Sequence, residues 1–459
     1  MSSEALLAAT VPPGESRPWS TILALRRDPL GYLERIAARY GDIAHLRVGP
    51  YRLVYVNHPD LVHEVLVAKD ASFIKGRALD QAKEVFGKGL LTSEGELHKG
   101  QRRLIQPAFH RRRVEAYAEA MAADAAAAAA RWRDGESLDI AREMMSLTLR
   151  IVARSLFSVD VEEESAREVG RALDGLIAAF SLVAIPLGGL LRKIPTPSAR
   201  RAEQGRATLD ALIYGLIDER RKAGTKAGTK VSIEDAGEDL LSLLLAARDE
   251  DGGLMDAAQV RDEALTLFLA GHETTANALA WTWYLLALHP EAEARFHAEV
   301  DAVLGDRLPG AKDMPDLPYT RQILAESMRL YPPAWAVSRR AIEPVTIGGY
   351  PIPAGAGVLA SQWVAHRDPR FFPDPLAFRP ERWTEDFEAG LPKLAYFPFG
   401  GGPRLCIGMG FAKMEGVLLL ATIGRRWRMR LVPGHPVEPY PRITLRPRNG
   451  VRVILTKRG

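Results

Sequence analysis

Residues 397–416 read FPFGGGPRLCIGMGFAKMEG, and no other stretch of the sequence constrains the protein so strongly. The only cysteine of the chain, Cys406, follows three consecutive glycines there and precedes an apolar segment typical of a helix. Backbone N–H groups and the helix dipole at that position favour a thiolate. A free cysteine is more often a small buried core residue, but such a residue does not need three glycines beside it. From the residues alone, a ligand or nucleophile and a core cysteine stay about equally open.

The composition of the whole chain is that of a globular protein. Its 459 residues include 61 Lys and Arg against 57 Asp and Glu, which gives a formal net charge of +4. That excess is too dilute to bind nucleic acid. A single cysteine excludes an intramolecular disulfide, a cysteine-based zinc finger and an iron–sulfur cluster. The same cysteine usage fits a reducing compartment, so we expect a cytoplasmic location.

We expect neither a targeting segment nor an integral membrane anchor. The first residues lack a basic region, and Pro12 and Pro13 interrupt their apolar run. The most apolar stretch, residues 176–191, is too short for a span and contains Pro186. This stretch is better interpreted as a helix end followed by a loop.

Helical patterns dominate the rest of the chain. The clearest lie at residues 113–132, 209–221, 238–248 and 317–331. Strand-like pieces occur near both ends of the sequence, at residues 43–48, 52–56, 345–352 and 450–456. A small sheet is therefore expected to join distant parts of the chain. The repeat KAGTKAGTK, residues 222–230, predicts a surface connector, and no linker divides the chain into domains.

Two segments resemble known motifs and fail at a required position. The run HETTA from His272 begins like a zinc-protease helix, but Ala276 stands where the second histidine ligand belongs. The run GDRLPGAK imitates a phosphate-binding loop, but Ala311 replaces the lysine after the second glycine. No convincing GxGxxG follows a strand. Any electrons that the protein uses are therefore expected from a separate protein.

The cysteine segment resembles the signature of the cytochrome P-450 family of haem-thiolate monooxygenases, F-G-x-G-x-R-x-C-x-G. The fixed positions are matched by Phe399, Gly400, Gly402, Arg404, Cys406 and Gly408. The resemblance implies haem b, iron protoporphyrin IX, with the thiolate of Cys406 as axial ligand. It also implies that Phe399 packs on the sulfur side and that Arg404 pairs with a haem propionate. An anionic sulfur pushes electron density toward iron and favours O–O cleavage.

A second motif of the family concerns an ion pair. Glu326 and Arg329 in AESMRL share one helix face at i and i+3. Alone such a pair means little, because solvated helix faces contain many. In the family the pair joins an arginine of a downstream P-E-R-W/F segment, which Arg382 in PERW supplies here. The resemblance implies a buried network that organises the haem-side core.

The run LAGHETTANAL, residues 269–279, resembles the family's long central helix. Glycine and threonine are poor choices inside a buried helix, and Thr274 can bond the carbonyl of Ala270 and open a local groove. Without the cysteine segment, this pair would merely loosen a core helix. The resemblance implies that Gly271 makes room for dioxygen, while Thr274 and Glu273 deliver protons to it. His272 falls at a variable position.

Three more residues match partners of the haem propionates. His98 stands in ELHKGQRR where most members of the family have tryptophan, and Arg102 follows at i+4. An imidazole can also donate to a carboxylate. Arg339, after YPPAWAVS, matches another frequent propionate partner, and an ordinary solvated arginine is the alternative.

The resemblance implies a mainly α fold with a small β region, as one cytochrome P-450 domain over residues 1–459 that encloses the haem. Residues 1–20 are expected to be a flexible N-terminal segment. The implied activity is insertion of one oxygen atom from O2 into an apolar organic substrate, by hydroxylation or epoxidation. Electrons would come from a separate ferredoxin or flavodoxin and its reductase, as in soluble bacterial members.

Specificity in the family comes from segments that correspond here to about residues 73–91, 175–189 and 333–338. Their apolar character predicts a ligand such as a terpenoid, a steroid or a fatty acyl chain. The predicted pocket residues are Phe86, Leu90, Phe180, Ala334, Trp335 and Val337. Arginines at positions 102, 103 and 111–113 predict either a docking patch for an acidic redox partner or a solvated helix face.

Two other functions stay open at this point. A relative in the family could use peroxide or isomerise its substrate, although the intact pair of Glu273 and Thr274 argues against that. A haem-thiolate protein could instead act as a non-catalytic sensor of gas or redox state. Such a sensor should lack a large substrate cavity, and the apolar regions around Phe180 and Trp335 favour one.

Overall fold

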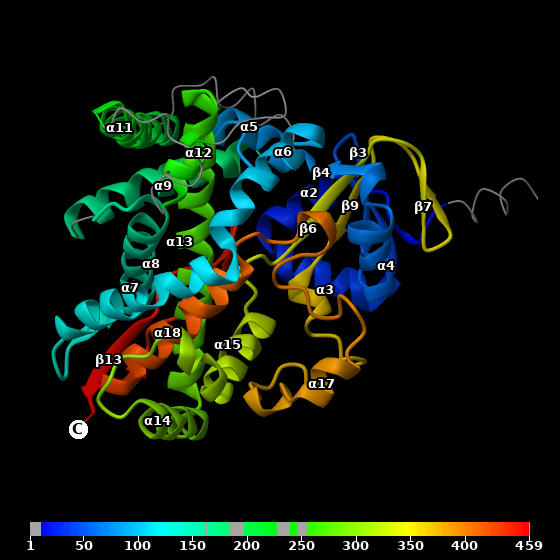
Figure 1. The fold of residues 1–459 in the computed structure, drawn as a ribbon. Helices are drawn as coiled ribbons and strands as arrows, with labels where there is room; N and C mark the ends of the chain where they lie inside the picture. Colours follow the sequence, from blue (N-terminus) through cyan, green and yellow to red (C-terminus); the bar gives the residue numbers. More distant parts are fainter. Residues whose placement is uncertain (1–10, 161–162, 184–196, 227–238, 247–254, 459) are drawn as a thin grey trace, which may run out of the picture.

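The computed structural model describes residues 11–160, 163–183, 197–226, 239–246 and 255–458. Helices make up most of the molecule, and a small sheet lies to one side of them (Figure 1). This is the mainly α fold with a small β region that the sequence predicts. Within the described ranges, no helix is both long enough and apolar enough to cross a lipid bilayer.

The longest helix, α13 (Ala257–Leu288), runs through the middle of the helical part (Figure 1). Apolar residues occur all around it, which is typical of a helix with neighbours on every side. Asp256 caps its start by accepting a hydrogen bond of 2.7 Å from a backbone N–H of the first turn. Phe268 stacks on Phe157 of α8 (Ile140–Phe157), with the ring centroids 4.2 Å apart. The central helix is thus fixed inside the core.

An alanine-rich helix, α7 (Arg111–Ala130), packs against α18 (Met409–Arg426), the helix that follows the cysteine. Small side chains allow this close approach. Trp427 ends α18 and donates from Nε1 to the carbonyl oxygen of Ala129 at 2.9 Å. The helix predicted at residues 113–132 is confirmed, shifted by two residues at each end.

The main sheet has six strands and joins the N-terminal part of the chain to residues 337–360, so distant segments meet as expected, but the predicted strands at residues 345–352 and 450–456 belong to other sheets. Its strand order is β1-β2-β3-β9-β6-β4. The strands are β1 (Gly14–Glu15), β2 (Ile43–Val48), β3 (Tyr51–Val56), β4 (Phe73–Lys75), β6 (Val337–Ala341) and β9 (Gly357–Ala360). The pairing of β3 with β9 is parallel, while β4 pairs antiparallel with β6. This second pairing brings Lys75 opposite Arg339.

Part of the segment at residues 1–20, which was expected to be flexible, forms regular structure. Residues 1–10 lie outside the described part, but β1 pairs with β2, and the N–H of His45 donates to the carbonyl oxygen of Pro13 at 2.8 Å. Helix α2 (Pro18–Arg27) starts at a proline, whose fixed φ suits the first helical position. Residues 14–20 are therefore ordered by backbone hydrogen bonds.

Smaller sheets account for the other predicted strands. The segment 345–352 is a hairpin of β7 (Val345–Ile347) and β8 (Tyr350–Ile352), because Gly348 and Gly349 have φ of +54° and +80°. A three-stranded sheet has the order β10-β13-β5, and a two-stranded sheet joins β11 to β12. These strands are β5 (Ser137–Asp139), β10 (Trp427–Leu431), β11 (Pro439–Pro441), β12 (Leu445–Pro447) and β13 (Arg452–Lys457).

One predicted loop differs from the structure, and one predicted helix end agrees with it. Helix α11 (Pro197–Lys226) continues through half of the expected connector at residues 222–230, since lysine and alanine are good helix formers. Helix α9 (Glu163–Val183) covers the first half of the apolar stretch 176–191. The later residues of both segments, 227–230 and 184–191, lie outside the described part.

The remaining helices complete the fold. They are α3 (Pro29–Tyr40), α4 (Pro59–His63), α5 (Arg77–Phe86), α6 (Gly95–Ile105), α12 (Leu240–Ala246), α14 (Pro290–Leu304), α15 (Pro318–Leu330), α16 (Gln362–Ala365) and α17 (Glu385–Gly390). Short turns are η1 (Glu64–Ala68), η2 (Asp70–Ser72), η3 (Gln106–Phe109), η4 (Ala311–Asp316), η5 (Pro380–Arg382) and η6 (Gly402–Arg404).

Candidate active site

The cysteine loop lies between η6 and α18 and is closed by its own backbone. The N–H of Cys406 donates to the carbonyl oxygen of Phe399 at 3.0 Å. Gly400 and Gly402 have φ of +75° and +68°, a region that favours glycine. A Cβ at Gly402 would lie 1.9 Å from the carbonyl oxygen of Leu66. Because glycine has no side chain, the loop packs directly against η1. This contact fixes the position of the cysteine.

The thiol of Cys406 faces an internal space. Its residue is exposed, yet protein atoms surround it closely enough for burial to raise the pKa of the thiol. Both observations hold if the sulfur points into a hollow inside the molecule. The backbone N–H of Gly408 and the charge of Arg102 act in the opposite sense and lower that pKa. These two groups favour the thiolate that binds a metal.

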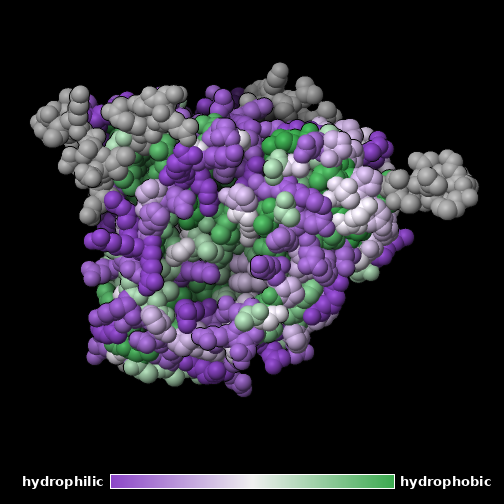
Figure 2. Space-filling model, turned by 45° about the vertical axis from the view of Figure 1, so that its right-hand side comes forward, coloured by the Kyte–Doolittle hydropathy of each residue, from purple (hydrophilic) through white to green (hydrophobic). Residues whose placement is uncertain are grey.

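One residue of the central helix is exposed in the same way as Cys406. Ala270 is exposed, although residues 263–269 before it are all buried. Because α13 also packs against α18, the exposed Ala270 and Cys406 indicate a space between α13 and the cysteine loop. Figure 2 shows a hollow near the middle of one face of the molecule, with apolar side chains in it.

Positively charged side chains gather near the thiol. Burial, with the charges of Arg404 and Arg339, lowers the pKa of Lys75 to about 7, although Glu94 opposes the shift. Burial and Arg404 likewise lower the pKa of Arg339 to about 10. Arg102 lowers the pKa of Cys406 and also that of His98, so the cluster adjoins the cysteine. Cations crowded in a buried place form a site for an anion.

Two polar atoms of this cluster lack a partner among the described residues. They are Nε2 of His98 and Nε of Arg339, both buried. Burial, with Lys75 and Arg404, lowers the pKa of His98 to about 4. A buried polar group left unpaired costs about 1–3 kcal/mol. The two carboxylates of haem b would satisfy both atoms and neutralise the cluster, so these residues fit the cofactor that the sequence implies.

Arg404 has carboxylate partners within the chain, which the sequence motif does not indicate. Its Nη1 donates to Glu94 at 2.5 Å, and its Nε lies 3.4 Å from Asp70. A further bond of 3.2 Å reaches the carbonyl oxygen of Phe73. The guanidinium is therefore shared with two carboxylates of the chain, while its charge still acts on Arg339.

Sequence reasoning missed Lys75. Its Nζ donates to the carbonyl oxygens of Leu90 and Ser93 at 2.8 and 2.7 Å and lies 3.5 Å from Nδ1 of His98. A lysine is rarely buried without a partner. Only the pairing of β4 with β6 places it beside Arg339, and the sequence has no local signal for that.

The middle of α13 has threonine hydroxyls bound to its carbonyls. Thr274 donates from Oγ1 to the carbonyl oxygen of Ala270 at 2.7 Å, as its spacing predicts. Thr148 of α8 donates to the carbonyl oxygen of His272 at 3.0 Å. Such bonds compete with the helix ladder and loosen it locally. The hydroxyl of Thr274 therefore lies on the turn that includes the exposed Ala270.

The packing of α8 on α13 explains why residue 271 is a glycine. A Cβ there would lie 2.9 Å from Cγ2 of Val152 on α8. The missing side chain thus allows close packing of α8 on α13, which differs from the predicted role of making room for dioxygen.

Glu273 is buried and faces β12. Its Oε1 accepts from Oγ1 of Thr444 at 2.5 Å and from Nε of Arg446 at 2.8 Å. Arg446 also donates to Asp174 at 2.7 Å, and the side chain of Asp174 is 59% exposed. Oε2 of Glu273 has no partner among the described residues. A polar chain thus leads from the buried carboxylate to the surface.

The structure brings Glu326, Arg329 and Arg382 together. Nε of Arg329 donates to Oε2 of Glu326 at 2.8 Å, and Nε of Arg382 donates to Oε1 at 3.0 Å. Trp383 adds a bond of 2.9 Å from its Nε1 to Oε2. Arg329 also donates to the carbonyl oxygen of His366 at 2.8 Å. Both members of the central pair are fully buried, so the network ties α15 to the segment before the cysteine.

The predicted pocket residues fall in two groups. The rings of Phe86 and Phe180 meet with their centroids 6.1 Å apart, and Leu90 belongs to the same apolar core. Trp335 donates from Nε1 to the carbonyl oxygen of Arg442 at 2.9 Å. Ala334 and Val337 are half-buried on the sheet side. Residues 184–189 of the second specificity segment lie outside the described part.

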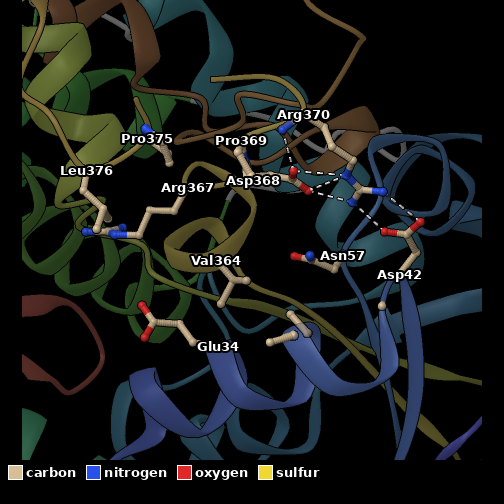
Figure 3. Close-up of a pocket in the computed structure, with 13 residues that line it drawn as sticks. Glu34, Asp42, Asn57, Val364, Arg367, Asp368, Pro369, Arg370, Pro375 and Leu376 are labelled. Atoms are coloured by element: carbon tan, nitrogen blue, oxygen red, sulfur yellow. Dashed lines mark hydrogen bonds and ion pairs between the residues drawn. The ribbon is translucent and has the colours of Figure 1, made fainter. Parts of the chain in front are cut away.

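A separate cavity of about 610 Å³ contains none of the predicted site residues. It lies between α3 and the segment after α16 (Figure 3). Arg367 stacks on Trp363 at 3.3 Å, and Arg370 pairs with Asp42 and Asp368. Its polar groups are thus largely paired with one another, unlike those near Cys406.

Comparison with known proteins identifies a matching family. The cytochrome P-450 family model matches residues 12–453. Cyclooctatin synthase of Streptomyces melanosporofaciens is 40% identical over 95% of this chain and 93% of the relative. Pentalenene oxygenase of Streptomyces avermitilis is 36% identical over 100% of this chain and 99% of the relative.

Two further similarities bear on activity and fold. Cyclooctat-9-en-7-ol 5-monooxygenase of Streptomyces melanosporofaciens is 40% identical over 93% of both chains. Among solved structures, the retinoic acid-bound cyanobacterial CYP120A1 matches with a TM-score of 0.85 and 25% identity, covering 98% of this chain and 99% of that one.

Proposed function

Because this chain belongs to the cytochrome P-450 family and is a haem-thiolate monooxygenase of apolar substrates, we propose that its substrate is a terpenoid. Relatives named as pentalenene oxygenase and cyclooctat-9-en-7-ol 5-monooxygenase support this narrower class, since each matches along nearly the whole chain. The aromatic contact between Phe86 and Phe180 supports it as part of an apolar core without charged groups, in which both rings are buried.

In this proposal the thiolate of Cys406 would hold haem b, and His98, Arg339, Lys75 and Arg404 would bind its propionates. When bound, this cofactor supplies the activation of O2, which takes two electrons from redox partners. The charge of Arg102 and the N–H of Gly408 stabilise the thiolate against the effect of burial.

Protons reach the distal side through α13 in this proposal. The hydroxyl of Thr274 donates to Ala270 and keeps lone pairs that can accept another proton. Glu273 precedes Thr274 in the sequence. Its Oε2 has no hydrogen-bond partner among the described residues, while its Oε1 accepts from Thr444 and Arg446. Glu273 would therefore supply the proton that Thr274 passes to the reacting oxygen.

Electrons enter on the cysteine side in this proposal. Phe109 of η3 lies 3.7 Å from the position of a Cβ at Gly408, so the segment beside η3 adjoins the cysteine loop. Arg103, Arg111 and Arg112 are exposed there. We assign this surface to a ferredoxin or flavodoxin with its reductase, because an acidic partner would be attracted by the arginines.

A substrate titration tests the proposed class. Cyclic terpene hydrocarbons or alcohols should displace water from ferric haem and shift its spin state at low micromolar concentration, as expected for an apolar pocket. Fatty acids of equal carbon number serve as the control. A shift with fatty acids and none with any terpenoid would overturn the assignment.

A further inference from the structure

The loop at residues 87–92 is held by two neighbouring carboxylates of α13. Oδ2 of Asp262 accepts from the backbone N–H of Lys88 at 2.7 Å. Oε2 of Glu263 accepts from the backbone N–H of Leu90 at 2.9 Å. The two residues, here called the clasp, thus bind alternate amides of one loop.

Two glycines of the loop make this approach possible. A Cβ at Gly87 would lie 2.1 Å from the carboxyl carbon of Asp262. A Cβ at Gly89 would lie 2.2 Å from Oγ1 of Thr266 and 2.4 Å from the carbonyl oxygen of Asp262. Gly87 also has φ of +80°. The loop therefore lies directly on α13, with no space for a side chain at either position.

The clasp also connects to α11. Nη1 of Arg261 donates to Oδ1 of Asp262 at 2.8 Å, and its Nε donates to Asp210 at 2.6 Å. Arg261 is buried. One arginine thus links α11, α13 and the loop, three elements that come from separate parts of the sequence.

Glu263 is held in a nearly dry environment. Its side chain is fully buried, and Oε1 has no partner among the described residues. Burial and Asp262 raise the pKa of Glu263 to about 8, against the bond from Leu90 and the charge of Lys75. A neutral carboxyl still has an oxygen that accepts from an N–H. The bond to Leu90 therefore does not depend on a charge.

We propose that Asp262 and Glu263 are positioning residues that fix the 87–92 loop as one wall of the substrate pocket. The loop follows Phe86 and includes Leu90, whose side chains belong to the apolar core that contains Phe180. The inference rests on the proposed function, which assigns these side chains to substrate binding. Neither carboxylate touches substrate in this account, and both set the affinity for ligands large enough to reach the wall.

Four variants of the haem-loaded protein test the clasp. Glu263→Leu removes the side-chain oxygen that accepts from the N–H of Leu90, and Glu263→Gln keeps an oxygen acceptor at that position. Gly89→Ala places a methyl group against Thr266 and the carbonyl oxygen of Asp262, and so displaces the loop from α13 without changing either carboxylate. Glu291→Leu, at an exposed carboxylate of α14, is the matched control. A carbon monoxide difference spectrum first shows that each variant holds its haem.

Hydrogen exchange and two azole ligands provide the readouts. We expect Glu263→Leu and Gly89→Ala to speed exchange of the amides at residues 88 and 90 and to weaken clotrimazole about tenfold, the effect of one lost buried hydrogen bond. Imidazole, which is too small to reach the wall, should bind all variants equally. Glu263→Gln and Glu291→Leu should behave as the wild type in every measurement.

The outcomes separate this inference from the function on which it rests. Unchanged exchange and unchanged clotrimazole affinity in both Glu263→Leu and Gly89→Ala would overturn the clasp while leaving the monooxygenase intact. Loss of imidazole binding together with clotrimazole binding would also count against it, because the defect would then lie at the haem. A wild-type protein that binds no azole would overturn the proposed function, and exchange would still decide whether the carboxylates hold the loop.

Discussion

Glu273 Oε1 lies 2.8 Å from Nε of Arg446, so the buried carboxylate of the central helix is tied to β12. Its neighbour Thr274 is instead bound to Ala270 of the same helix. Adjacent residues of α13 thus have separate partners, one leading to the exposed Asp174 and one beside the exposed Ala270. Arg446 orients the carboxylate of Glu273 but cannot pass on a proton, so the proposed relay is limited to Glu273 and Thr274.

Replacing Thr274 by alanine tests the end of that relay. Thr274→Ala should retain haem and accept electrons, because the hydroxyl of Thr274 is bound to Ala270 of its own helix. Product per electron should fall at least about tenfold, while hydrogen peroxide rises, since the contribution of a positioned acid is typically about 10²–10⁴-fold. Electron consumption, product and peroxide are measured together. Thr274→Ser, which keeps the hydroxyl, is the control, and equal yield from Thr274→Ala would assign Thr274 a purely structural role.

The buried ion pair of Arg329 and Glu326 should be needed for folding. Arg329→Met breaks the fully buried ion pair and leaves the carbonyl oxygen of His366 without its donor, although Arg382 and Trp383 still bind Glu326. It should lower the free energy of unfolding by about 3–5 kcal/mol. Arg295→Met, at the exposed pair with Glu381, should cost about 0–1 kcal/mol. Denaturant unfolding with haem retention measures both. Similar losses in the two variants would contradict the network.

Stability should depend on pH through Glu415 of α18. Burial raises the pKa of Glu415 to about 8, and neither of its carboxyl oxygens has a hydrogen-bond partner among the described residues, whereas the unfolded chain ionises near 4.5. The folded state therefore binds this proton more tightly, and the stabilisation is lost as pH rises from about 4.5 to 8. Glu415→Gln should make the free energy of unfolding less dependent on pH in this range. Glu291→Gln is the control, and an unchanged slope in Glu415→Gln would argue against a neutral Glu415.

Docking of the redox partner should depend on salt and on Arg112. Reduction by a ferredoxin should slow with rising ionic strength, and Arg112→Glu should slow it further at low salt, because opposite charges attract over about a Debye length. Arg47→Glu, at an exposed arginine of β2, is the control. Equal rates for Arg112→Glu and Arg47→Glu would exclude the proposed surface.

The sequence predicts those parts of the site that lie close together along the chain. The glycines before Cys406, the spacing of Thr274 and Ala270, and the helix face of Glu326 are local patterns, and the structure places them as those patterns imply. These features follow from helix geometry and from the conformational freedom of glycine.

The remaining contacts join segments far apart in sequence, and no local pattern encodes them. Lys75 reaches the cation cluster through the pairing of β4 with β6. Arg404 meets Glu94, which lies 310 positions earlier. Gly271 is explained by Val152 of a different helix. Tertiary packing decides such partners, and it also orders residues 14–20, for which a flexible segment was expected.

The carbon monoxide difference spectrum of the reduced protein tests the central assignment most directly. Thiolate ligation by Cys406 predicts a strongly red-shifted Soret band in the wild type. Cys406→Ala should lose that band, since the chain contains no second cysteine. A wild-type band at the position of an imidazole-ligated haem, or a red-shifted band that persists in Cys406→Ala, would contradict the account.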